Sequence, residues 1–353
     1  MGLAGPERGQ AGRLVLTAAV AGAGGAGFAA VGWPAAWLMG AMVATATMAL
    51  CGVRLGLPGR VRDLAYVLLG ISIGSNVTPE SLGQVGAWPG SIVLLGVSVA
   101  VTMLASALYL EKMHGWDRKT ARFASMPGAF SAVAVIALDS GADMPRVVLA
   151  QSLRIFVLVV LIPPILVLLT GTGSGAAVTP LAGPATNTPV EAGLTLAASV
   201  AAAGLLGWLR VPAGVLLGAM LASAVLHATG LVQGRFPPAL IIAGFVATGS
   251  VIGARFHGTR METVARTIPA AVVSVLVALA ISAGIAAFGA RILGLPFGEV
   301  WLAYAPGGVE AMAAMALSLG LDPAFVGAHH VLRILGLNLV SSLWLTGKGP
   351  GGK

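Results

Sequence analysis

Long apolar runs are the feature of this sequence that most limits how it can fold. Most of the 353-residue chain consists of apolar stretches of about 17–25 residues, and only 9% of its residues are charged. A soluble domain usually carries about 25% charged residues, because its surface must face water. Too few charges are present to coat a soluble protein of this size, so the surface of the protein is predicted to face lipid.

The apolar runs have the length of membrane-spanning helices. At about 1.5 Å per residue, about 20 residues cross the roughly 30 Å hydrocarbon layer of a bilayer. The bilayer core offers no water to an open backbone, so these spans are predicted to be helical. We therefore expect an all-α polytopic membrane protein with the lipid bilayer as its first partner.

The net charge of +8 comes from lysines and arginines in short loops between the apolar runs. This distribution is typical of a multi-pass protein of the inner (cytoplasmic) membrane, and we expect no direct binding of nucleic acid. In the first half of the chain, most basic loop residues fall on the side of the N-terminus, whereas Arg146 falls on the other side. The N-terminus is therefore predicted to be cytoplasmic.

Glycine, proline and charged residues divide the apolar sequence into two sets of six candidate membrane segments. An uncharged stretch rich in Gly, Thr and Pro, residues 171–189, separates the two sets and is predicted to be a linker. The candidate segments are 13–31, 34–51, 63–77, 86–110, 119–138, 146–170, 190–209, 213–229, 238–255, 264–289, 299–319 and 323–346.

The two sets of segments are copies of one unit. The motif that begins at Pro34 returns 178 residues later, and four further motifs return with a shift of 179 residues. Rare residues that keep one shift are difficult to obtain by chance, even in a chain rich in Ala, Gly and Leu. We therefore predict a first membrane repeat over 13–170 and a second over 190–346. The pairs with the 179-residue shift are Gly70–Gly74 with Gly249–Gly253, Pro127-Gly128 with Pro306-Gly307, Asp143 with Asp322, and Arg154 with Arg333.

The relative orientation of the repeats stays open at this point. The charge bias of the first half disappears in the second half, as happens when two repeats are inverted in the membrane. Inversion requires an odd number of crossings in each repeat, so one of the six segments would have to be re-entrant. The alternative is a pair of parallel repeats with six crossings each.

The fifth segment of each repeat contains a helix breaker in the middle of the predicted span. Pro127-Gly128 interrupts the first copy, and Pro306-Gly307-Gly308 interrupts the second copy. Proline removes a backbone donor and glycine permits unusual dihedral angles, which predicts a discontinuous helix. Such a break exposes helix ends that can bind an anion, although a simple proline kink would give the same pattern.

Ionisable residues follow these breaks inside the apolar sequence. Glu310 lies three to four residues after its break, where it could be a proton or cation site or an N-terminal helix cap, and Ser131 is the equivalent residue of the first repeat. Arg154 and Arg333 lie about ten residues into the sixth segments, at mid-depth in the membrane. They could hold an anionic solute, or they could form structural ion pairs or contacts with carbonyl groups.

The remaining candidate site residues are Gln151, His329 and His330. His329 and Arg333 share a helix face because they are four residues apart. Adjacent histidines on a helix point about 100° apart, so His329 and His330 cannot readily chelate one metal ion. We predict no metal site, no cofactor and no enzymatic activity, since no nucleophile–base pair is visible and Cys51 is the only cysteine.

The sequence contains the motif Ala124-Ser-Met-Pro-Gly, followed by Asp143 and Arg154, and a second copy of this pattern around Pro306 and Arg333. In these motifs the chain resembles the AbrB family of duplicated bacterial membrane proteins. Members of this family are often labelled ammonia monooxygenases or regulators of gene expression. The sequence lacks the ligands of a monooxygenase and any segment long enough to fold as a DNA-reading head.

On physical grounds, the duplicated halves, broken helices and intramembrane charges favour a secondary transporter of a small solute, with an anion as the candidate class. The solute site would lie at the repeat interface, and Glu310 would couple transport to protons. The alternative function is a membrane-embedded regulator that acts through a partner, for which the exposed segment 111–122 is the candidate contact. A homodimer is one assembly that we consider.

Overall fold

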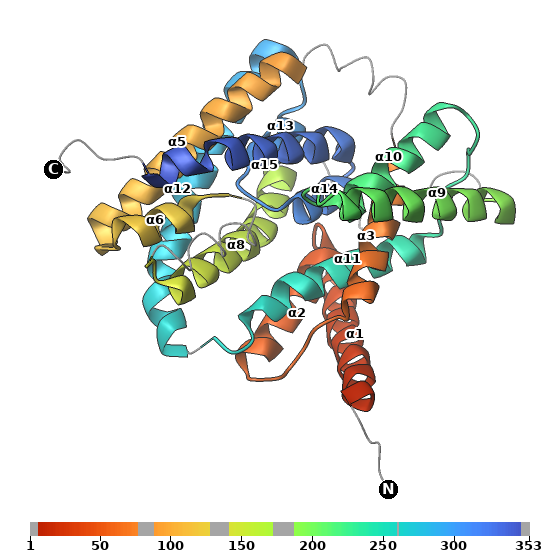
Figure 1. Ribbon diagram of the computed structural model, residues 1–353, viewed down its shortest axis with the longest axis horizontal. Helices are drawn as coiled ribbons and strands as arrows, with labels where there is room; N and C mark the ends of the chain where they lie inside the picture. Colours follow the sequence, from red (N-terminus) through yellow and green to blue (C-terminus); the bar gives the residue numbers. More distant parts are fainter. Residues whose placement is uncertain (1–5, 77–87, 128–140, 172–186, 260, 347–353) are drawn as a thin grey trace, which may run out of the picture. The chain divides into compact units, whose positions relative to one another are not determined.

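The computed structural model describes residues 6–76, 88–127, 141–171, 187–259 and 261–346. Over these residues the protein is helical and forms no strand. The helices of the first repeat are α1 (Pro6–Ala30), α2 (Ala36–Leu50), α3 (Gly59–Gly74), α5 (Trp88–His114), α6 (Arg118–Ser125) and α8 (Met144–Thr170) (Figure 1). The helices of the second repeat are α9 (Pro189–Trp208), α10 (Gly214–Ala228), α11 (Pro238–Gly253), α12 (Met261–Leu293), α13 (Phe297–Tyr304), α14 (Val309–Ser318) and α15 (Pro323–Thr346).

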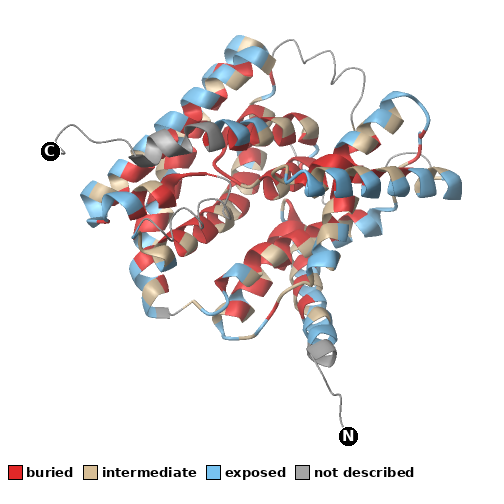
Figure 2. Ribbon diagram, viewed as in Figure 1, coloured by how far each residue is buried: buried red, intermediate tan, exposed pale blue. Residues whose placement is uncertain are grey.

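The helices have the dimensions and the surface of membrane segments. Among the described residues, six helices are long and apolar enough to cross a bilayer. The apolar parts of α1 and α9 are only 17% buried, and Figure 2 shows exposed residues along most of α9. Leucine and valine side chains on such faces would be unfavourable in water and favourable against lipid tails. The prediction of an all-α polytopic membrane protein is confirmed.

The described chain forms two compact units, and each unit contains parts of both repeats. Unit 1 contains α1, α2, α3, α9, α10, α11 and α14, together with the second part of α8 and the first part of α15. Unit 2 contains α5, α6, α12 and α13, together with the first part of α8 and the remainder of α15. The two repeats are therefore not the two compact bodies of the protein.

Within unit 1, helices of one repeat pack against helices of the other repeat. Helix α3 packs against α10, and α2 packs against α11. The first crossing brings Gly70 against the backbone of Leu216, and the second brings Gly249 against the backbone of Leu38. Glycines at these points let the backbones approach closely, which stabilises helix pairs in a membrane where water does not drive association. The paired glycines of α3 and α11 thus have a packing role.

The same contacts give the direction of each helix in unit 1. Gly249 contacts α2 near Leu38, and Gly253, four residues later, contacts α2 near Met42 and Ala46, so α2 and α11 run in the same direction. By the same reasoning α3 and α10 run in the same direction, because Gly70 meets Leu216 and Gly74 meets Met220.

Helix α3 runs opposite to α2. Helices α1 and α2 are antiparallel, since Gly25 contacts Trp37 whereas Gly24 contacts Ala44. Thr17, nearer the start of α1, therefore lies beside the end of α2, and its hydroxyl accepts a hydrogen bond from the Gly56 N–H, three residues before α3 begins. Later in α3, Leu69 contacts Gly244 near the start of α11, at the level where α2 begins.

It follows that α10 runs opposite to α2, its counterpart in the first repeat. The repeats are inverted in unit 1, which answers the question that the loop charges leave open. Inversion across a membrane requires that one of the six segments does not cross. The fifth segment suits this role, because α13 has 8 residues and α14 has 10, or about 12 and 15 Å of helix, each about half of the hydrocarbon thickness.

Inversion can be tested with the natural cysteine. Cys51 is exposed just after α2, and the equivalent Thr229 is exposed just after α10. We expect a membrane-impermeant maleimide to label intact cells carrying only one of two variants, wild type or Cys51→Ser/Thr229→Cys, and to label the other only after permeabilisation. Labelling of both variants from the same side would contradict the inverted arrangement.

The glycine crossing of α3 and α10 can be tested by Gly70→Ala. A Cβ at Gly70 would lie 2.5 Å from the Leu216 carbonyl oxygen and 2.7 Å from the Cβ of Ala219, which requires the helices to move apart. Overpacking of this kind costs about 1–3 kcal/mol, more than the helix propensity that alanine adds. The thermal unfolding midpoint in detergent should fall for Gly70→Ala and stay equal or rise for Gly204→Ala, because Gly204 on α9 faces open space. Equal midpoints for the two variants would show that the crossing does not depend on close approach.

Candidate functional site

In the second repeat, the structure describes the helices both before and after the break. Helix α13 ends at Tyr304, residues 305–308 are not helical, and α14 begins at Val309. In the first repeat α6 ends at Ser125, and Met126 and Pro127 are not helical. Residues 128–140 lie outside the described residues, so the predictions for Gly128 and Ser131 stay predictions. Each break leaves backbone carbonyls at a helix C-terminus that need hydrogen-bond donors.

The two buried arginines supply those donors within unit 2. Arg154 of α8 donates from its two terminal nitrogens to the carbonyls of Ala124 and Met126, both at 3.2 Å. Arg333 of α15 donates to the Ala305 carbonyl at 2.7 Å and to the Gly307 carbonyl. Contacts with backbone carbonyls were one of the roles considered for these arginines from the sequence, and both arginines make such contacts.

A second bond of the same kind recurs in both repeats. The Gln151 side-chain amide donates to the Phe123 carbonyl at 3.0 Å, and the His330 Nε2 lies 2.9 Å from the Leu302 carbonyl. The donor positions and the acceptor positions are each 179 residues apart. The duplication thus preserves this contact although the side chain has changed from an amide to an imidazole, and it explains why polar residues occupy these two positions.

His329 belongs to a separate buried hydrogen-bond chain. Its Nε2 lies 2.9 Å from the Ser91 hydroxyl, which lies 3.1 Å from the Tyr304 hydroxyl. The Tyr304 hydroxyl also donates to the Ser91 carbonyl at 2.9 Å, and the Trp88 ring packs edge-on against His329. The chain fixes α5 beside α13 and α15 and places a titratable group inside unit 2.

The charge of the arginines is not neutralised by any described carboxylate. Arg154 is 6% exposed and Arg333 is 3% exposed, whereas the three ion pairs among the described residues all lie on exposed side chains. The C-terminal ends of α6 and α13 provide partial negative charge through their carbonyls. They do not cancel two full positive charges, so this part of unit 2 is electrostatically suited to an anion.

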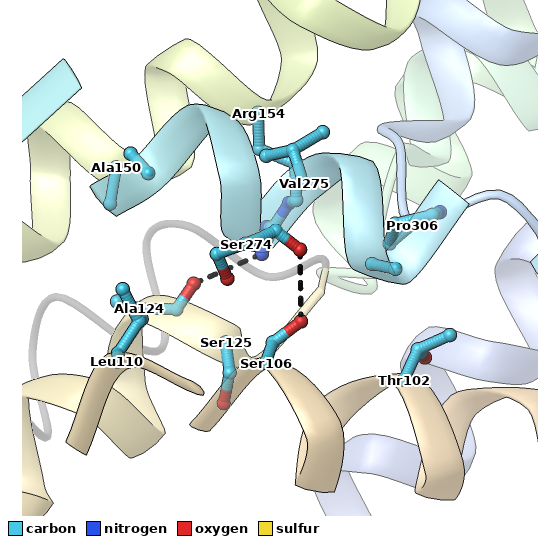
Figure 3. Close-up of a pocket in the computed structure, with 12 residues that line it drawn as sticks. Thr102, Ser106, Leu110, Ala124, Ser125, Ala150, Arg154, Ser274, Val275 and Pro306 are labelled. Atoms are coloured by element: carbon cyan, nitrogen blue, oxygen red, sulfur yellow. Dashed lines mark hydrogen bonds between the residues drawn. The ribbon is translucent and has the colours of Figure 1, made fainter. Parts of the chain in front are cut away.

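A small cavity lies beside Arg154 in unit 2 (Figure 3). Its volume of about 20 Å³ is sufficient for one water molecule. Both helix breaks border it, through Ser125 at the end of α6 and Pro306 just after α13. The Nε of Arg154 has no hydrogen-bond partner among the described residues, and hydroxyl groups line the cavity beside the guanidinium. The hydroxyl residues are Thr102 and Ser106 of α5, Ser125 of α6 and Ser274 of α12.

Sequence reasoning missed Thr102, Ser106 and Ser274. Each lies between apolar neighbours in a long helix, and Ser and Thr residues in such helices often bond only to their own helix. Thr102 does so, with the Ser98 carbonyl at 2.6 Å, but the Ser106 hydroxyl donates across to the Ser274 carbonyl of α12 at 3.4 Å. Only the packing of α5 against α12 brings these hydroxyls to Arg154.

Glu310 lies in unit 1, at the start of α14. It is partly buried and within electrostatic reach of Tyr66 and Arg62 on α3. The expectation that Glu310 and Arg333 face one cavity stays a prediction, because the two residues belong to different compact units. No cluster of three or more His, Cys, Asp or Glu suited to a metal ion occurs in the part of the chain that the structure describes.

These features define the class of protein: a duplicated, all-α polytopic membrane protein with inverted repeats and arginine-capped helix breaks. The chain belongs to the AbrB family, whose model is described as "Transition state regulatory protein AbrB" and matches residues 3–74 and 37–346.

Two relatives are similar over nearly their whole length. "Putative regulator AbrB" from Escherichia coli (strain K12) is 32% identical over 325 residues, which is 89% of this chain and 90% of that protein. "Uncharacterized protein YhjN" from Bacillus subtilis (strain 168) is 28% identical over 343 residues, 90% of this chain and 88% of that protein.

The capping role of Arg333 can be tested by Arg333→Lys. Lysine keeps the charge but cannot reproduce the fixed fork that reaches two carbonyls, so at least one of Ala305 and Gly307 should lose its donor. A hydrogen bond to a charged group contributes about 1.5–3 kcal/mol, so the thermal unfolding midpoint in detergent should fall by several degrees. Arg291→Lys, at the exposed end of α12, is the control and should leave the midpoint unchanged. A midpoint unaffected by Arg333→Lys would mean that the carbonyls do not depend on the guanidinium.

Proposed function

We propose that this protein is a secondary transporter of a small organic anion. The observation that carries the proposal is the pair of buried guanidinium groups, Arg154 and Arg333, which lack a carboxylate partner among the described residues. Such charges are costly inside a membrane and usually mark a solute or ion pathway. An anion bound beside them would neutralise charge that the protein leaves uncompensated.

The surroundings of Arg154 support a binding role. Guanidinium and hydroxyl donors converge on one cavity at two helix breaks, and discontinuous helices form the solute sites of many transporters. The cavity is small as described, so a solute larger than water would require α5 and α12 to separate there. Local separation of helices around a fixed site is also the motion that alternating access requires.

Inverted repeats support the same proposal. Two copies of one unit with opposite orientation can adopt each other's conformation, which exchanges access from one side of the membrane to the other. In this proposal the membrane is the inner membrane and the N-terminus is cytoplasmic. Glu310 is the proposed proton-coupling group, since it is the carboxylate next to the second helix break and lies partly buried at the start of α14.

The word "regulator" in the name of the Escherichia coli relative favours a second candidate function, a membrane-embedded regulator. The segment 111–122 is the proposed contact for a partner. In the structure this segment is the end of α5, a three-residue connection and the start of α6, with Lys112, Arg118 and Lys119 exposed. A basic turn of this size could bind an acidic surface of a partner, but it is too short to fold as a domain.

Uptake into proteoliposomes tests transport directly. We expect the purified protein to accumulate at least one radiolabelled anion from a panel of acetate, octanoate, succinate and benzoate when a proton gradient is imposed. Arg154→Lys should lower the initial rate of that uptake by about tenfold or more, because lysine cannot keep the forked geometry of the guanidinium. Arg146→Lys, on the exposed end of the same helix, is the matched control and should transport normally.

Glu310→Gln separates binding from coupling in the same assay. Uptake down a solute gradient should persist in this variant, whereas the stimulation by a proton gradient should be lost. The proposal of transport would be overturned if no anion of the panel entered the liposomes, or if Arg154→Lys and Arg146→Lys transported at the same rate. Uptake that responds equally to the proton gradient in Glu310→Gln would remove Glu310 from the coupling step.

A further inference from the structure

A large apolar groove runs between α5 and α15 within unit 2. It has a volume of about 500 Å³ and is distinct in its lining from the cavity beside Arg154. Leu95, Val99 and Met103 line it from α5, and Leu337 lines it from α15. Arg333 is the charged residue among the lining residues that the structure describes.

Arg333 gives the lining of this groove a charged group. Its side chain is 3% exposed, and its Nε has no hydrogen-bond partner among the described residues, although both terminal nitrogens donate to carbonyls. A buried N–H donor without an acceptor is unfavourable, and more so when it belongs to a charged group. An acceptor that carries negative charge would satisfy this donor and the charge together.

We propose that the groove binds an unbranched alkyl monocarboxylate, with the carboxylate on Arg333 and the alkyl chain along α5 and α15. This proposal rests on the proposed function for the anion-binding role of Arg333, and it assigns the class of anion. The chemistry matches both parts of such a molecule: a guanidinium can pair with the carboxylate, and an apolar lining can pack against the methylene groups.

The volume of the groove is similar to that of a single alkyl chain. If a methylene group occupies about the volume of a water molecule in the liquid, roughly 30 Å³, then 500 Å³ accommodates about 16 methylene groups. A diacyl lipid would need about twice this volume and would bring a phosphate rather than a carboxylate. A short carboxylate such as acetate would leave most of the apolar lining without contacts.

Photolabelling tests the proposal. The full-length protein in phosphatidylcholine nanodiscs is irradiated with hexadecanoate that carries a diazirine near its terminal carbon, at alkaline pH. We expect the label on peptides that contain residues 92–104 or 332–337, and we expect unlabelled hexadecanoate to compete at least tenfold better than hexadecan-1-ol. Equal competition by the alcohol would show that the groove holds lipid chains without recognising the carboxylate, and would overturn the proposal. Stronger competition by phosphatidylglycerol than by hexadecanoate would also overturn it.

Two glycine variants give a matched control that does not disturb the helix breaks. Gly96 lines the groove and Gly284 on α12 is exposed, and a Cβ at either position would meet open space. Gly96→Phe should therefore fill the groove and lower the labelling by at least fivefold, whereas Gly284→Phe should be labelled as the wild type is. Equal labelling of the two variants would overturn the proposal.

The alkyl carboxylate site and the transport function can be contradicted independently. If octanoate or a shorter anion is transported but the groove is not labelled, the alkyl site is wrong and the transporter proposal stands. If the groove is labelled with the expected selectivity but no anion enters proteoliposomes, transport is wrong and the protein binds the carboxylate without moving it.

Discussion

The structure of unit 2 depends on one constraint, which is that a helix interrupted inside a membrane must find donors for its terminal carbonyls. Water is absent from the hydrocarbon core, so each orphan carbonyl costs several kcal/mol unless the protein satisfies it. Arginine is the side chain best suited to this task, because it presents several donors in a fixed fork and stays protonated. Arg154 and Arg333 meet the constraint at equivalent places in the two repeats. The consequence is chemical: satisfying the backbone in this way places two positively charged side chains in the buried part of unit 2, and these charges are the basis of the proposed anion site.

Unit 1 meets a different constraint, close packing without a hydrophobic driving force, and it does so with small residues. Glycines at equivalent positions of the two repeats form the crossing of α3 with α10 and that of α2 with α11. The two copies can therefore pack closely on each other although equivalent helices run in opposite directions. The resulting unit has few buried polar groups other than Ser and Thr hydroxyls that bond to nearby carbonyls, such as Thr45 with the Ala41 carbonyl at 2.6 Å. Charge chemistry and helix packing are thus largely separated: unit 2 contains the buried arginines, and unit 1 contains the closest backbone crossings.

Much of this fold follows from the sequence, because length, hydropathy and repeated rare residues are properties of local sequence. The predicted segments 190–209 and 323–346 agree with α9 and α15 to within one residue at each end, and the interruption at Pro306 lies where α13 and α14 separate. The inverted direction of the repeats could not be predicted, since it depends on which glycine faces which carbonyl across a crossing. The hydroxyls of Thr102, Ser106 and Ser274 were missed because they meet only through helix packing. The compact units also could not be predicted, since α3 packs against α10 and α5 packs against α12 across the repeats. Sequence spacing relates residues on one helix, whereas the site is made by neighbours on different helices, such as Arg333 and Ala305, or Ser106 and Ser274.

The differences between the two copies carry as much functional information as their similarity. Arg154 bonds to the carbonyls of residues 124 and 126, but Arg333 bonds to those of 305 and 307, which correspond to 126 and 128 in the first repeat. Arg333 therefore reaches two residues further into its break than Arg154 does. This shift of one guanidinium along its helix break accompanies a change of surroundings, from the hydroxyl-lined cavity at Arg154 to the apolar groove at Arg333. Two identical caps would make a symmetric site with no preference for the orientation of a solute. Because the caps differ in position and in the chemistry beside them, a solute with one charged end and one apolar end would bind in a single orientation.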